Sequence, residues 1–118
     1  MLVLVSFFNT GRMAVKTHCC MYLDGASGAV NFVEDHAIQG SVAYKVPPAA
    51  TMPASQRAEL DTALAQLPDN QAPADSEVFL VSWLSAGKWE TRTYDRTHLP
   101  DPVVKVCDML HIPKTWIQ

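Results

Sequence analysis

Apolar and polar residues alternate with a period of two over most of the first half of the chain, a pattern that predicts β-strands. The alternation runs through residues 14–23 and returns through residues 38–46. Pro47 and Pro48 end the second segment, because neither can donate a hydrogen bond to a neighbouring strand. Residues 2–8, LVLVSFF, are a β-branched and aromatic run of strand length. The first half is therefore expected to be rich in strands.

The apolar period lengthens to that of a helix in two later segments, residues 53–67 and residues 102–111. Pro53 suits the first turn of the first helix, and the second helix follows Asp101, a natural N-cap, and begins with Pro102. The predicted buried stripes are Leu60, Ala63, Leu64 and Leu67 in the first helix and Val103, Val106, Cys107 and Leu110 in the second. The polar side chains of the first helix that are expected to face solvent are Arg57, Glu59, Asp61 and Gln66.

Between the two helices lies the pattern of a β-hairpin. Residues 77–84, EVFLVSWL, are apolar on both faces, and a short Ala86-Gly87 turn joins them to a more polar strand. The first strand is expected to be central in a sheet and the second to lie nearer its rim. Together the elements predict an α+β fold, with an antiparallel or mixed sheet of about 4–6 strands covered by two helices, at about residues 53–67 and 102–111.

Length and composition place these elements in one domain. The chain has 118 residues and a mass of 13.0 kDa, and 48% of its residues are hydrophobic. Residues 1–118 are thus expected to form a single domain that buries a core. Residues 1–12 are either an extra strand or an upstream extension of the reading frame, because Met13 is a second plausible start.

Charge and cysteine content exclude several kinds of partner. The net charge is −3, and the nine Lys and Arg residues are scattered, so we expect no nucleic-acid partner. The longest apolar run, residues 1–8, is far shorter than the roughly 20 residues of a membrane-spanning helix, so we expect no membrane anchor. The three cysteines include the adjacent Cys19 and Cys20, which are poorly placed to bridge each other. A reducing, cytoplasmic location is the expectation.

The sequence carries no strong catalytic signature. It has no Gly-rich phosphate loop and no HExxH, GxSxG or paired CxxC motif, so we expect no cofactor and no enzymatic activity. A weaker idea is a small hydrolase or isomerase with an acid/base pair drawn from Asp35, His36 and His98. Isolated residues of these types in turns more often cap helices or stay solvated.

The richest chemical constellation is His18, Cys19 and Cys20 near one end and Cys107 with His111 near the other. Residues four apart on a helix share a side, so Cys107 and His111 would supply two zinc ligands. His18 and either Cys19 or Cys20 would complete a tetrahedral site. Strand alternation sends Cys19 to the opposite face from His18, however, and Cys107 lies in an apolar stripe, where cysteine behaves as a small hydrophobe. Zinc binding is therefore the alternative hypothesis.

The aromatic residues have mostly structural interpretations. Trp83, Trp89 and Tyr94 are expected in the core or in cross-strand pairs. Trp116 differs, because it lies near the chain end beside Ile117 and must either fold back onto the domain or dock onto another chain.

Residues 42–110 also resemble a known family. A strand is followed by a Pro-started helix (MPASQRAELDTALAQL), two strands with a short turn, and a Leu-Pro-x-Pro helix start (HLPDPVVKVCDML). This layout resembles the emfourin family, which are small proteinaceous inhibitors of thermolysin-like metalloproteases. The resemblance implies a role in protease inhibition, with the turn formed by Asp24, Gly25, Ser27 and Gly28 as the part to test.

Two hypotheses follow. The first is a small non-enzymatic protein-binding domain, either a protease inhibitor or a subunit of a larger assembly, whose partner is another protein chain or a second copy. Its apolar surface would come from residues 2–8 and 112–117. Its candidate binding residues are Asp24, Gly25, Ser27, Gly28, Trp116 and Ile117. The second is the zinc-binding protein described above.

Overall fold

A six-stranded antiparallel sheet in the order β4-β3-β2-β1-β5-β6 forms the frame of the protein. The computed structural model describes residues 2–9, 16–23, 28–36, 49–71, 77–114 and 117. The strands are β1 (Leu2–Asn9), β2 (Lys16–Leu23), β3 (Ala29–His36), β4 (Ala50–Thr51), β5 (Glu77–Ser85) and β6 (Lys88–Asp95). The predicted α+β fold is confirmed, and every pair of neighbouring strands in it is antiparallel.

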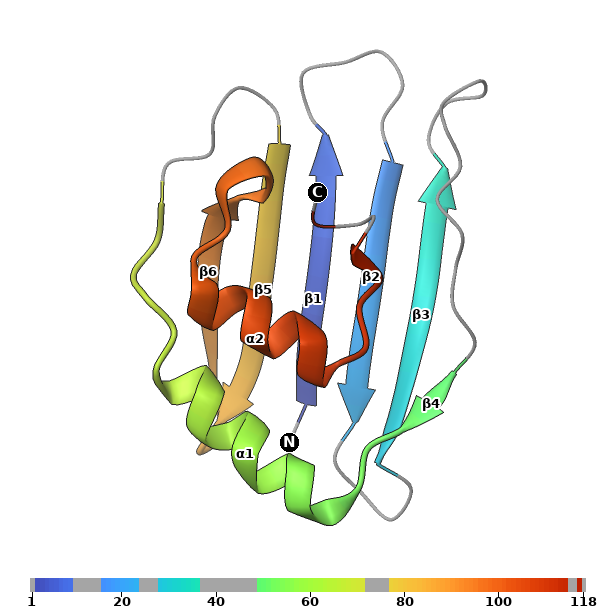
Figure 1. Cartoon of the computed structure of the whole chain (residues 1–118), viewed down its shortest axis with the longest axis vertical. Helices are drawn as coiled ribbons and strands as arrows, with labels where there is room; N and C mark the ends of the chain where they lie inside the picture. The colour runs from blue at the N-terminus through green and yellow to red at the C-terminus, as the bar shows by residue number, and fades with distance from the viewer. Residues whose placement is uncertain are drawn as a thin grey trace.

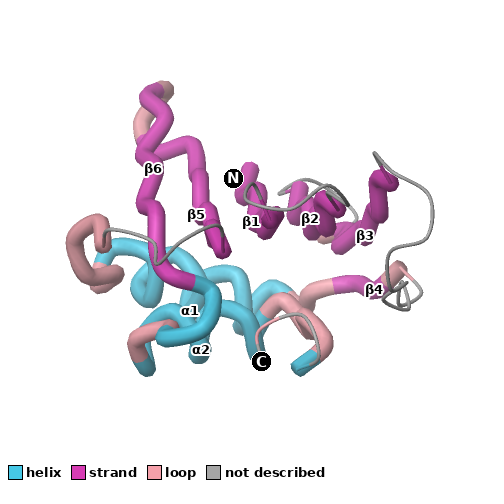
Figure 2. The backbone as a smooth tube through the Cα atoms, turned by 90° about the horizontal axis from the view of Figure 1, so that it is seen from above, coloured by secondary structure: helices cyan, strands magenta, loops and turns pink. Residues whose placement is uncertain are grey.

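Two helices, α1 (Ala54–Ala65) and α2 (Asp101–Met109), lie on the same side of this sheet (Figures 1 and 2). A short 3-10 helix, η1 (Arg96–His98), links β6 to α2. Both predicted helices are confirmed, with ends shifted by one or two residues. Figure 2 also shows that the turn end of the β5–β6 hairpin rises on the other side of the sheet, away from the helices.

The strand order agrees with the hairpin prediction and corrects the first half of the chain. β5 is central, between β1 and β6, and β6 is an edge strand. LVLVSFF lies in β1, which pairs with β2 on one side and β5 on the other. The strand predicted over 38–46 lies outside the described residues. Alternation did not predict β3, whose last two residues, Asp35 and His36, were expected in a turn and instead pair with Thr17 and Lys16.

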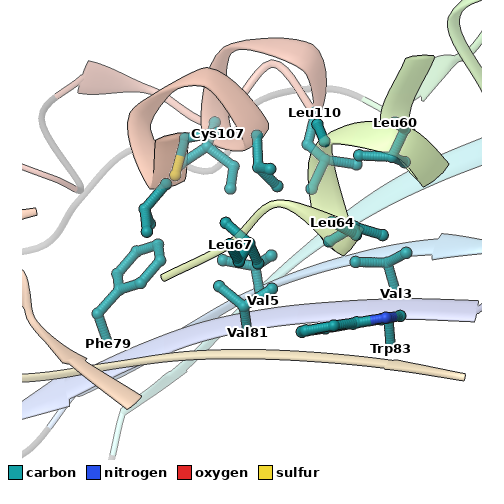
Figure 3. Close-up of a cluster of buried hydrophobic side chains, with 14 of the residues drawn as sticks. Val3, Val5, Leu60, Leu64, Leu67, Phe79, Val81, Trp83, Cys107 and Leu110 are labelled. Carbon is teal, nitrogen blue, oxygen red and sulfur yellow. The ribbon is translucent and has the colours of Figure 1, made fainter. Parts of the chain in front are cut away.

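The core lies between the helices and one face of the sheet (Figure 3). Strand residues at alternating positions face the helices, and the helices meet them with the stripes that the sequence predicted. The sheet contributes Val3, Val5, Val30, Phe79, Val81, Trp83 and Tyr94 to this core. The helical layer contributes Leu60, Ala63, Leu64, Leu67, Val103, Val106, Cys107, Leu110 and Ile112.

The start of α2 differs from the prediction by one position. The N-cap is Pro100 rather than Asp101, and Asp101 and Pro102 are the first two helical residues. Pro100 has the extended geometry of an N-cap (φ −61°, ψ 151°), and its carbonyl accepts hydrogen bonds from the amides of Val103 and Val104 at 3.0 and 3.1 Å. Asp101 therefore places its charge in the first turn, where the helix dipole favours it, without capping an amide.

Tyr94 ties β6 to the chain that leaves α1. Its ring is fully buried, and its hydroxyl donates a 2.6 Å hydrogen bond to the carbonyl oxygen of Pro68. Burial disfavours the charged phenolate and raises the pKa of Tyr94 to about 12. The neutral hydroxyl is thus part of the folded structure.

Replacing Tyr94 with Phe keeps the ring and removes this hydrogen bond. We expect Tyr94→Phe to lower the free energy of unfolding by about 1 kcal/mol at pH 7. An unfolded tyrosine ionises near pH 10, and Tyr94 in the folded protein near pH 12, so ionisation destabilises the wild type as the pH rises through that window. Urea unfolding at pH 7 and between pH 10 and 12 checks this. A difference in unfolding free energy between the wild type and Tyr94→Phe that stays constant up to pH 12 would contradict this expectation.

Candidate functional site

The second face of the sheet is apolar, and no described helix covers it (Figure 2). Residues of β1 and β5 that alternate with the core positions point to this side. We call it the open face. Its described apolar side chains are Leu2 and Leu4 from β1, Ala29 from β3, Val78, Leu80 and Leu84 from β5, and Trp89 from β6. All of them are half-buried except Trp89, which is 49% exposed.

Hydroxyl side chains lie between the apolar ones. In the register of β5 and β6, Leu84 is opposite Trp89 and Ser82 is opposite Thr91. The Ser82 and Thr91 hydroxyl oxygens lie 3.1 Å apart and are hydrogen bonded to each other. The polar groups in the middle of the open face therefore satisfy part of their hydrogen bonding within the face itself.

Trp83 and Trp89 are six residues apart and have different roles. Trp83 is 6% exposed and faces the core, with the Arg92 guanidinium 5.3 Å from the centre of its ring. Trp89 makes the expected cross-strand pair with Leu84 but remains largely in solvent. Position in the sequence distinguishes the two tryptophans. Trp89 lies two residues after the Ala86-Gly87 turn, on the strand predicted to be nearer the rim of the sheet.

Three of the four charged side chains of β6 are kept off the open face. Lys88, Glu90 and Arg92 alternate on the helix side of the strand, and Arg92 Nη1 lies 3.6 Å from Glu90 Oε2. Of the described side chains on the open face, only Asp95 at the end of β6 is charged, and it is 7% exposed. The described exposed residues of the face, Asn31, Trp89 and Thr91, are thus an amide, an aromatic ring and a hydroxyl, and none of them is charged.

Asp95 has a structural role at the start of η1. Its carboxylate accepts hydrogen bonds from the Thr97 amide at 3.0 Å and the Thr97 hydroxyl at 2.7 Å, and His98 Nδ1 lies 3.3 Å away. These hydrogen bonds, led by that of the Thr97 hydroxyl, hold the pKa of Asp95 below its usual value. The arrangement is that of a cap, because the acceptor is bound to the turn that it begins.

The hydrolase hypothesis fails on geometry. His98 follows β6, whereas Asp35 and His36 end β3, and three strands separate β3 from β6 in the sheet. At about 4.8 Å between neighbouring strands, the two elements lie on the order of 19 Å apart. That distance is too long for a shared acid/base pair.

The outer edge of β6 is partly closed by the segment that follows α1. The Gln71 amide donates to the Thr93 carbonyl at 2.8 Å, the Thr93 amide donates to Asn70 Oδ1 at 2.8 Å, and the Asp95 amide donates to Gln71 Oε1 at 3.4 Å. These contacts occupy backbone groups that another strand would otherwise use.

The zinc hypothesis assumed that Cys107 and His111 share a helix side, and this premise is wrong. The helix ends at Met109, and His111 lies beyond it with a φ of 59°. The Ile112 amide donates to the Cys107 carbonyl and the His111 amide to the Asp108 carbonyl, which together form a Schellman motif. The Cys107 side chain is fully buried, while His111 is exposed.

The other three proposed zinc ligands lie on β2. His18, Cys19 and Cys20 pair in the backbone register with Phe7, Ser6 and Val5 of β1. In the part of the chain whose side chains are described, no group of three or more His, Cys, Asp or Glu residues is placed to hold a metal ion.

Gly28 is the one candidate of the 24–28 turn that the structure describes, and it is a structural residue. It is buried with a φ of 61°, and its carbonyl accepts a 2.9 Å hydrogen bond from the Met52 amide. Arg57 packs over Gly28 and donates a hydrogen bond from Nε to the Met52 carbonyl at 3.3 Å. The prediction that the Arg57 side chain faces only solvent is therefore corrected. Asp24, Gly25 and Ser27 lie outside the described residues.

The C-terminal apolar segment folds back onto the domain. Ile112 is 4% exposed, and Ile117 packs against the core cluster. Trp116 lies outside the described residues. The two described apolar residues of the surface expected at residues 112–117, Ile112 and Ile117, therefore belong to the core or pack against it, and the exposed apolar surface of the described residues is centred on the sheet.

A hollow of about 410 Å³ lies between α1 and α2. Its lining residues are Ala63, Gln66, Asp101, Pro102 and Lys105. The polar members Gln66, Asp101 and Lys105 are all exposed, so the hollow encloses no buried polar group that would orient a ligand. The open face remains the stronger candidate site.

Comparison with protein-family models, with curated proteins and with solved structures finds no match for this chain. Among the helices that the structure describes, none is long and apolar enough to cross a membrane.

Gly28 and Gly87 both have a positive φ, but only at Gly28 would an added Cβ also clash with neighbouring atoms. Substituting each of them therefore distinguishes a steric clash from backbone strain alone. A Cβ on Gly28 would lie 2.6 Å from the Met52 carbonyl oxygen and 2.5 Å from Arg57, whereas a Cβ on Gly87 (φ 77°) would meet nothing within 4 Å. We expect Gly28→Ala to destabilise the fold by about 3 kcal/mol and Gly87→Ala by about 1 kcal/mol. Urea unfolding of both variants checks this, and equal losses would argue against a close-packed Gly28.

His111 occupies a position that glycine normally fills. A left-handed backbone is strained for a residue with a Cβ, so we expect His111→Gly to raise the free energy of unfolding by about 0.5–1 kcal/mol. The matched control, His111→Ala, keeps the Cβ and should give no gain. Thermal unfolding of the three proteins without added metal decides this, and a large loss in both variants would indicate that the imidazole has a role that the structure does not give it.

Proposed function

We propose that this chain is a non-enzymatic protein-binding domain that presents the open face of its sheet to another protein chain. The observation that carries the proposal is the apolar character of that face. An antiparallel sheet with one face in water usually carries polar residues there, but β5 places Val78, Leu80 and Leu84 at three of its four described open positions. Contiguous apolar surface of this kind marks protein interaction sites.

The composition of the face also fits a binding surface. The centres of protein–protein interfaces are depleted in charge and enriched in aromatic residues. Here Lys88, Glu90 and Arg92 of β6 lie on the helix side, Asp95 is buried, and Trp89 stands half exposed beside Leu84. A tryptophan of this kind, anchored by a cross-strand neighbour, is the residue type most often found to dominate binding energy.

The layout of residues 42–110 favours a first partner to test. α1, β5, β6 and α2 occur in the order of the layout that resembles the emfourin family, while the strand that this layout has before the first helix, in the segment that starts at residue 42, lies outside the described residues. We therefore propose a thermolysin-like metalloprotease as the hetero-partner, with the domain acting as an inhibitor. This assignment rests on element order and is independent of the argument from the open face.

The test measures thermolysin activity on a quenched fluorescent peptide with increasing amounts of the domain, together with direct binding. Trp89→Lys places a charge on the open face at an exposed position, so the fold should be retained. We expect the wild type to inhibit, and Trp89→Lys to weaken inhibition at least about tenfold.

Ala58→Lys is the matched control, because Ala58 is exposed on α1, on the opposite side of the sheet, and receives the same charge. It should inhibit as the wild type does. Inhibition that is equally strong in Trp89→Lys would assign the inhibitory contact to another surface. A wild type that neither binds nor inhibits thermolysin would overturn the inhibitor assignment.

A further inference from the structure

We propose that a second copy of this chain occupies the open face, so that two sheets pack face to face around a two-fold axis. This inference rests on the proposed function, because it assumes that the open face binds protein. It names a second copy as the occupant when no other partner is present, so a protease that binds the same face has to displace that copy. Three features of the structure support a second copy: the area of the sheet, the absence of charge among the described exposed residues of the face, and the partly closed outer edge of β6.

The area of the sheet is sufficient for a dimer. Five strands, β1, β2, β3, β5 and β6, are eight or nine residues long. At about 3.4 Å per residue along a strand and about 4.8 Å between strands, the backbones of these five strands would cover roughly 650 Å² if the twisted sheet were laid flat. Specific complexes bury about 600–1,000 Å² on each partner, so the whole sheet, β2 and β3 included, reaches the lower end of that range.

Charge favours a copy of the same chain over a strongly charged partner. The chain has a net charge of −3, and two copies must meet without bringing like charges together. The described exposed residues of the open face are uncharged, and Lys88, Glu90 and Arg92 lie on the opposite side of β6. A neutral apolar face is complementary to itself, as a two-fold interface requires.

The hydroxyls of the face lower the cost of covering it. Buried polar groups are costly when they lose their hydrogen bonds to water. Ser82 and Thr91 are already hydrogen bonded to each other at 3.1 Å, so a partner need not supply that bond. The centre of the face can therefore be buried by an apolar surface like itself.

The edge of β6 directs association to the face. Sheets with exposed edge strands can also join side by side through those strands. Asn70 and Gln71 occupy the outer backbone groups of Thr93 and Asp95, which hinders strand addition along that part of β6. Face-to-face packing leaves these bonds intact. Aligned sheets pack about 10 Å apart with their strands about 30° from parallel.

The oligomeric state of the full chain tests the proposal. We expect light scattering and analytical ultracentrifugation, from about 1 to about 200 µM, to show a mass that rises from 13.0 kDa towards twice that value. Trp89→Lys and Leu84→Lys should each weaken dimerisation at least about thirtyfold, because a two-fold interface contains each substitution twice. Ala58→Lys should dimerise as the wild type does, and thermal unfolding should confirm that all variants are folded.

The outcomes separate the two proposals. A wild type that stays monomeric, while binding thermolysin through a Trp89-dependent contact, would overturn the dimer and keep the protein-binding function. A dimer that persists in both Trp89→Lys and Leu84→Lys would place the interface elsewhere and overturn the proposed occupant. A wild type that is monomeric and inert towards thermolysin, with Trp89→Lys indistinguishable from it, would overturn both proposals.

Discussion

The packing of α1 and α2 against one face of the sheet is the interaction on which the rest of the structure depends. α1 lies between β4 and β5 in the chain, and α2 follows β6, yet both return to the same side. The central strands β1 and β5 give that side its valines and aromatic rings, and the helices bring their apolar stripes to meet them. Because both helices pack against the same face of the sheet, none of the described helices covers the opposite face.

The sequence predicts the helical layer and the hairpin well, because their signals are local and strong. Leu60, Ala63 and Leu64 repeat with a helical period, and all three are buried as expected. The double apolar pattern of β5 correctly places it in the centre of the sheet. The same pattern cannot tell which of two apolar faces will be covered, since that depends on where the helices dock. The open face could therefore be identified only once the fold was known.

Backbone conformation is what sequence reasoning did not predict at two residues. Gly28 and His111 both adopt a positive φ, which depends on how the chain closes a turn or ends a helix. His111 looked like a ligand because a continued helix would set it beside Cys107. β3 was missed for another reason: Asn31, Glu34 and Asp35 interrupt its apolar alternation, and its place is set by pairing with β2.

An antiparallel sheet with one uncovered face faces two hazards, association along its edge and association through its face, and this protein treats them differently. At the edge, Asn70 and Gln71 bond to β6, and three of the four charged residues of that strand lie on the helix side. On the open face neither device is used, since Trp89 and Leu84 stand together near the turn without a charge between them. A sequence selected only for solubility would gain by placing lysine or glutamate at such positions. The contrast between a protected edge and an unprotected apolar face is what a surface selected for burial against a partner would show.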